Sequence, residues 1–305
     1  MGSLSTTNVE FCLDVFKELN SNNVGENIFF SPLSLLYALS MILLGARRNS
    51  AEQMEKVLHF NHVVESLNPE FKDSSKCSQA GRIHSELGAL FSQIKQPNSN
   101  YTLSIANRLY GTKMMAFHQG KSVIVEMMCQ TGIFKLASIK KPQIQVLELP
   151  FVNNRLSMII LLPVGTAKLE QIEKQLNLKT FQEWTSSSNM LEREVEVHIP
   201  RFKLEIKYEL NSLLKSLGMT DIFDPIKADL SGMSSAKNLY LSKVIHKSYV
   251  DVNEEGTEAA AATGDLIVVK RFPIRTQFMA NRPFLFFIRH IHTNMILFCG
   301  KLASP

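Results

Sequence analysis

Two apolar segments near the end of the chain restrict the possible folds most. They are residues 283–288 (PFLFFI) and 295–299 (MILFC), and neither alternates apolar with polar side chains. A strand that is apolar on both sides has to be covered on both faces, so both segments are predicted to be neighbouring, deeply buried strands. A chain of 305 residues that is 45% hydrophobic and 20% charged can bury a core large enough to cover them.

The first third of the sequence is predicted to supply helices. Apolar residues recur at helical spacing between Phe11 and Leu19. A second, strongly apolar helix is predicted over Leu33–Leu44, with Ser31 as its N-cap and Gly45 at its end.

Strand patterns dominate after residue 101. Gln145–Pro150 and Leu156–Leu162 flank an Asn-Asn pair, which predicts a β-hairpin. Glu194–Ile199 and Lys243–Val252 alternate apolar and polar residues, as a half-buried strand does. Helices first and a largely antiparallel body afterwards predict one α+β domain over residues 1–305. Its helical part covers about 1–119 and its β-rich part 121–305.

Composition excludes several classes of function. The net charge is +5 without a run of basic residues, so no binding of nucleic acid is expected. No stretch of about 18 apolar residues is present, so no membrane span is expected. The N-terminus lacks the pattern of a conventional signal peptide, which favours a cytoplasmic protein, with release outside the cell possible without a cleaved signal. The four cysteines have no metal-site spacing and are expected to be free or buried thiols.

Signatures of enzymes are missing from the sequence. It contains no GxSxG, HExxH, GxGxxG or GxxxxGK[ST] motif, so neither catalysis nor a cofactor is expected. His290 and His292 would share one strand face, but no third ligand accompanies them, and an exposed strand edge is the better interpretation than a metal site. His246 lies in an alternating strand and is interpreted as a hydrogen-bonded interior histidine rather than a general base.

The segment GTEAAAATG, residues 256–264, allows two interpretations. It is either a flexible surface loop with a transient helical turn or a strand that enters a crowded sheet. In an extended conformation, Thr257, Ala259, Ala261 and Thr263 share one face, and their small size avoids overpacking. Downstream lies the dibasic pair Lys270–Arg271, which suits the acidic specificity pocket of a trypsin-like protease.

The motifs along the chain resemble those of one family. They are, in order, NIFFSPLSLLYALSMILLGA, PRFKLE, YELNSLLKSLGMTDIF, ADLSGMS, IHKSYVDVNEEGTEAAAATG and PFLFFIRHIHTNMILFCGKLASP. This set resembles the serpins, and within them the clade B group of ovalbumin-like intracellular serpins. The resemblance implies the serpin fold, with mixed helices and three β-sheets. It also implies a monomeric inhibitor that traps a serine protease after a reactive-centre loop is cleaved and inserts into the central sheet.

The resemblance also assigns roles to individual residues. The reactive-centre loop would cover about 254–275, and its scissile bond would be Lys270–Arg271, with cleavage after Arg271 as the open alternative. Ser31 and His246 match residues under the sheet where it opens, and Arg201 matches the basic partner of the first hinge residue. The hinge itself would consist of Glu254, Gly256, Thr257, Glu258, Ala259, Ala260, Ala261, Ala262 and Thr263.

One departure from the family pattern bears on activity. After SIANRLYGTKMMAFHQ the sequence passes near 119–121 directly into KSVIVEMMCQTGIFKLA, without the roughly eighty residues that the family places between them. The family has there a strand of the central sheet beside the insertion site and the helix that covers that sheet. Without them the chain would be an internally truncated serpin. The alternative to a trypsin-like protease inhibitor is therefore a non-inhibitory or inactive isoform.

Overall fold

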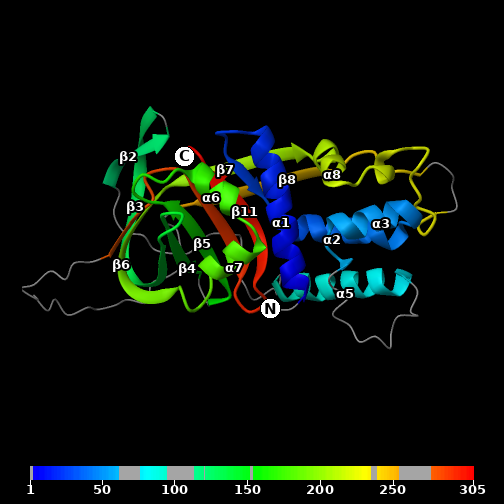
Figure 1. Ribbon diagram of the computed structural model, residues 1–305, viewed down its shortest axis with the longest axis horizontal. Coiled ribbons are helices and arrows are strands. Elements are labelled where there is room, and N and C mark those ends of the chain that lie inside the picture. Colours follow the sequence, from blue (N-terminus) through cyan, green and yellow to red (C-terminus); the bar gives the residue numbers. More distant parts are fainter. Residues whose placement is uncertain are drawn as a thin grey trace, which may run out of the picture.

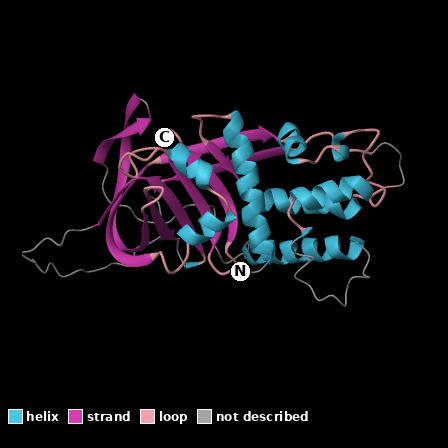
Figure 2. Cartoon of the chain, viewed as in Figure 1, coloured by secondary structure: helices cyan, strands magenta, loops and turns pink. Residues whose placement is uncertain are grey.

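The computed structural model describes residues 3–61, 76–94, 113–119, 121–151, 154–234, 239–253 and 276–305. Helices α2, α3, α5 and α8 gather at one end of the molecule and most strands lie at the other, together with α6 and α7, while α1 lies between the two ends (Figures 1 and 2). The helices are α1 (Ser3–Asn22), α2 (Pro32–Gly45), α3 (Arg48–Val57), α5 (Lys76–Ile94), α6 (Leu169–Gln175), α7 (Leu178–Trp184), α8 (Asn211–Leu217) and the 3-10 turn η3 (Asp221–Phe223). The strands are β1 (Ile28–Phe30), β2 (Lys113–Gln119), β3 (Lys121–Ile139), β4 (Ile144–Pro150), β5 (Leu156–Pro163), β6 (Leu191–Pro200), β7 (Phe202–Glu209), β8 (Ile245–Val252), β9 (Thr276–Met279), β10 (Phe284–His290) and β11 (Met295–Leu302).

The predicted buried strand pair lies inside the larger sheet, between the edge strand β1 and strand β5. β10 and β11 are antiparallel neighbours, and β10 also pairs with β5. The side chains of β10 from Phe284 to Ile288 are all fully buried, so both faces are covered as the sequence predicts. Gly300 lies opposite Phe286, and a Cβ atom at Gly300 would come within 2.3 Å of that ring. The glycine therefore makes room for the aromatic core.

One long strand connects two parts of the larger sheet. The strand order of this sheet is β1-β11-β10-β5-β4-β3-β6-β9, and β2 pairs with β3 beside this path. The long strand is β3. β3 pairs with β4 through Lys135–Ile139 and with β6 through Met127–Leu136. The predicted hairpin is confirmed, because β4 and β5 pair from Ile144–Pro163 to Pro150–Ser157.

Local sequence signals fix the ends of the helices. The Ser31 side chain caps α2 by accepting a hydrogen bond from the Ser34 amide, as predicted. Gly45 is the last residue of α2, and a Cβ atom there would collide with Met233, so close packing requires the glycine. Gly218 ends α8 in the left-handed region, at φ 120°, which is the conformation that a C-terminal glycine supplies.

A separate two-stranded sheet contains β7 and β8. The two strands pair over their whole length, from Phe202–Val252 to Glu209–Ile245. Among the described residues, β8 has β7 as its only strand partner.

The predicted junction lies between β2 and β3. These strands form an antiparallel hairpin in which Gln119 is opposite Lys121. The part of the chain before the junction thus ends in a strand.

Candidate functional site

The candidate site consists of the β7–β8 sheet and the elements on which it rests. β8 ends at Val252 and β9 begins at Thr276, so these two strands flank the predicted reactive-centre loop on either side. The hinge residues and the scissile pair Lys270–Arg271 lie outside the described residues, and their roles stay predictions.

Ser31 and His246 lie far apart in the sequence, and both are predicted to lie under the sheet where it opens. In the structure they are in direct contact. The Ser31 amide donates a hydrogen bond of 2.9 Å to His246 Nε2. The Ser31 hydroxyl donates at 2.7 Å to the carbonyl oxygen of Leu297 on β11. Both residues are 8% exposed. His246 is thus an interior hydrogen-bonded histidine, as its alternating strand predicts, and burial lowers its pKa below the usual value.

Ser248 and Tyr208, which were not predicted from the sequence, complete this contact. The Ser248 hydroxyl donates to the Phe29 carbonyl oxygen at 2.7 Å, and the Phe29 amide donates to the Tyr208 hydroxyl at 3.3 Å. Burial raises the pKa of Tyr208 to about 12, so the hydroxyl is neutral at physiological pH. The alternation of β8 places His246 and Ser248 on the same face, and this was the signal that could have identified Ser248. These bonds fasten the start of β8 and the end of β7 to β1 and α2.

Arg201 lies between β6 and β7. Its amide donates to the Glu126 carbonyl oxygen at 2.9 Å, and its guanidinium Nη1 is 3.6 Å from Glu126 Oε2. Both side chains are about half exposed, at 50% and 54%. Its predicted partner Glu254 is outside the described residues, so that pairing stays a prediction.

The C-terminal flank of the loop is held by the larger sheet. β9 runs parallel to β6, with Val195 opposite Thr276 and His198 opposite Met279. Arg282 follows β9 and donates from Nη1 to the Gly165 carbonyl oxygen at 3.2 Å.

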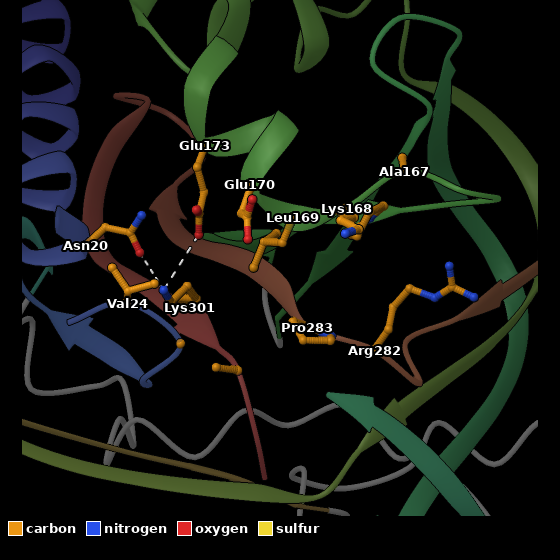
Figure 3. A pocket seen from close by; sticks show the side chains of 13 residues that line it. Asn20, Val24, Ala167, Lys168, Leu169, Glu170, Glu173, Arg282, Pro283 and Lys301 are labelled. Carbon is orange, nitrogen blue, oxygen red and sulfur yellow. Dashed lines mark hydrogen bonds and ion pairs between the residues drawn. The ribbon is translucent and has the colours of Figure 1, made fainter. Parts of the chain in front are cut away.

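A pocket of about 580 Å³ lies elsewhere, between the end of α1, helix α6 and β11 (Figure 3). Inside it, the buried ammonium of Lys301 contacts the Asn20 side-chain oxygen and lies 3.6 Å from Glu173 Oε1. A buried charge needs such partners to be stable. Among the described residues, none that lines this pocket belongs to β7 or β8.

The interpretation of the histidine pair as an exposed strand edge is wrong for His290. This residue ends β10 and is only 4% exposed, because its ring packs inward and contacts the Thr293 hydroxyl at 2.8 Å. His292 belongs to the following turn rather than to the strand, and the two ring centres are 5.7 Å apart.

Comparisons with known proteins agree with this architecture. A family model described as serpin (serine protease inhibitor) matches residues 6–120 and 111–305. Serpin B11 of Homo sapiens is 62% identical over 392 aligned positions that cover 100% of both chains. The leukocyte elastase inhibitor of Equus caballus is 36% identical over 396 positions, again with 100% of both chains covered. A crystal structure of uncleaved ovalbumin superimposes with a TM-score of 0.78 at 29% identity, with 100% of each chain covered.

The length of these alignments is consistent with an internal truncation. An alignment of 392 positions on a chain of 305 residues has to contain gaps in that chain. The two matches of the family model overlap at residues 111–120, beside the predicted junction near 119–121. Separately, none of the helices in the described ranges is long and apolar enough to cross a membrane. Motifs, fold and comparisons converge on one assignment: the chain belongs to the serpin family, among its clade B members.

Proposed function

We propose that this chain inhibits trypsin-like serine proteases, with Lys270–Arg271 as the scissile bond. The observation that carries the proposal is the position of β8. This strand leads directly into the hinge segment, and on the side away from β7 no described strand pairs with it. Such an edge has backbone amide and carbonyl groups ready to accept a further strand.

The small hinge residues suit this edge. An added strand has to place every second side chain against the interior face of the sheet. Thr257, Ala259, Ala261 and Thr263 are the residues that would occupy that face, and their volumes are small enough to fit without overpacking. β8 itself buries alternate side chains, including Val250 and Val252, which gives the added strand an apolar surface to extend.

The proposed reaction begins as ordinary proteolysis. The serine hydroxyl of the protease attacks the Lys270 carbonyl carbon and the Lys270–Arg271 peptide bond breaks. The serine proton passes through the protease histidine to the new amino group of Arg271. Before water hydrolyses the acyl ester, residues 254–270 add to β8 and carry the attached protease with them. The inhibitor performs no catalytic turnover of its own, and the proposal requires neither a metal nor a cofactor.

The same sheet favours a second candidate, a non-inhibitory serpin isoform. Full insertion places the new strand between two neighbours, whereas the described part of this sheet has only β7 and β8. A strand added to one edge gains hydrogen bonds on one side alone, so its transfer releases less free energy than insertion. The loop would then be cut and released as a substrate.

One experiment separates the two candidates. The full chain is incubated with trypsin and analysed on a denaturing gel. A covalent complex that resists SDS supports inhibition, whereas cleavage without a complex supports the second candidate. Lys270→Ala and Arg271→Ala variants locate the scissile bond, because only the variant at the true cleavage position loses the reaction. Because the described cysteines are free thiols and a reducing cytoplasm is the expected compartment, a reductant belongs in the assay. Size-exclusion chromatography checks the expected monomer.

A further inference from the structure

Three potential metal ligands meet on the outer part of the larger sheet. Cys129 on β3 lies directly opposite His198 on β6, and Glu196 lies two residues before His198 on the same face. Cys129 Sγ is 3.7 Å from His198 Nε2, and this nitrogen is 2.9 Å from Glu196 Oε1. All three ligand atoms lie within 4.8 Å of one another. The proposed inhibitory function uses none of these side chains.

The spacing is close to that of a tetrahedral zinc site. With Zn–S near 2.3 Å and Zn–N and Zn–O near 2.0 Å, neighbouring ligand atoms of a tetrahedron are about 3.3–3.6 Å apart. The observed 3.7 Å and 2.9 Å differ from these separations by a few tenths of an ångström. The Glu196 side chain is 27% exposed, so it has room to rotate toward that geometry.

The surroundings also suit an ion that enters from solvent. His198 is 2% exposed and fixed within the sheet, whereas Cys129 and Glu196 are partly exposed. Three protein ligands on one face leave a fourth position for water. A thiolate together with imidazole and carboxylate favours zinc over magnesium or calcium, which prefer oxygen ligands alone.

We propose that Cys129, Glu196 and His198 bind one Zn²⁺ ion. On binding, the Cys129 thiol proton leaves to solvent and the thiolate binds the metal. His198 would bind the ion through the lone pair of Nε2, so any proton carried by that nitrogen is released to solvent. Nδ1 of His198 is buried and has no hydrogen-bond partner among the described residues. Metal coordination replaces the contact between His198 and Glu196.

The bound ion would connect β3 to the strand that holds one end of the reactive-centre loop. The His198 carbonyl oxygen accepts a 2.9 Å hydrogen bond from the amide of Ala280, directly after β9. β6 therefore lies between the ion and β9, which begins where the predicted loop ends. The binding of zinc itself does not depend on the inhibitory function, so the two proposals fail separately.

Cobalt is the direct probe of this site. The reduced full chain is freed of metal with a chelator and titrated with Co²⁺ at pH 7.5. One equivalent should produce a thiolate-to-cobalt charge-transfer band and the intense visible bands of a tetrahedral ion. Both should disappear on adding Zn²⁺ and in Cys129→Ser. The Cys77→Ser variant on helix α5 is the matched control and should retain them.

Competition with a chromophoric chelator then measures the affinity for Zn²⁺. Cys129→Ser and His198→Gln should each weaken binding by more than about a hundredfold, since loss of even an outer partner typically costs 10–100-fold. His292→Gln should leave the affinity unchanged. Circular dichroism and a melting curve of each variant show that it is folded, and Cys129→Ala replaces any serine variant that is not. Absence of the charge-transfer band, or its survival in Cys129→Ser, would overturn the proposal and leave the cluster as a hydrogen-bonded network.

Discussion

Replacement of His246 by leucine tests how the start of β8 is fastened to the helical part of the molecule. The variant removes the acceptor of the 2.9 Å hydrogen bond from the Ser31 amide and leaves that buried amide without a partner. An orphaned buried donor costs about 1–3 kcal/mol. The matched control is His246→Gln, since the glutamine side-chain oxygen is able to accept the same bond.

Urea unfolding followed by circular dichroism measures the difference. His246→Leu should lower the free energy of unfolding by about 1–3 kcal/mol relative to His246→Gln, without a change in the denaturant slope. On heating, a loss of this size corresponds to a few degrees in the midpoint for a chain of this length. If the two variants unfold at the same urea concentration, the contact with Ser31 does not fasten β8 and the reasoning fails.

The same residue predicts a dependence of stability on pH. Because burial lowers the pKa of folded His246, the unfolded chain takes up the proton first, near pH 6.5. The contribution of His246 is therefore present above about pH 6.5 and is lost as the pH falls below it. Melting curves between pH 5 and 8 should show a shallower acid slope for His246→Gln than for the unchanged protein. Identical slopes would refute this assignment.

Three further changes test other parts of the account. Thr257→Arg should abolish an SDS-resistant trypsin complex while cleavage continues, because a large charged side chain is unable to enter the sheet; an unchanged yield of complex would contradict hinge insertion. Gly300→Ala should destabilise the protein by about 1–3 kcal/mol, because the new methyl group meets the buried Phe286 ring, and a neutral effect in urea unfolding would contradict the packing. His59 Nε2 donates a 2.7 Å hydrogen bond to the Asp14 carboxylate, which raises the pKa of that histidine, so its stabilisation is complete below about pH 6.5 and is lost as the pH rises through the folded value. Asp14→Asn should therefore lower the melting temperature more at pH 5.5 than at pH 9, and an equal loss at both would argue against this ion pair.

Features with a local physical cause were predictable from the sequence. The cap of α2 by Ser31 and the end of α8 at Gly218 follow from residues that lie next to each helix end. The strands β10 and β11 follow from their unbroken apolar composition. His246 was correctly interpreted as an interior histidine because the period of a strand assigns each side chain to one face.

Contacts between distant segments were harder to predict from the sequence. The pattern of apolar and polar residues does not predict that Ser31 contacts His246. Only the resemblance to the serpin family placed both residues under the same sheet. The proposed zinc ligands Cys129 and His198 are far apart in sequence and become neighbours through the register of β3 and β6. No sequence motif predicts that register. The strand-edge prediction failed because β10 ends at the buried His290 and His292 falls in the following turn.

The central claim is that a trypsin-like protease cuts at Lys270–Arg271 and that the freed loop then adds to β8. Mass spectrometry of the products formed with trypsin tests both parts in one measurement. The account predicts an SDS-resistant species in which the protease serine is esterified to Lys270, together with a free fragment that begins at Arg271. Cleavage at other bonds alone, with no covalent species at any ratio of inhibitor to protease, would contradict it.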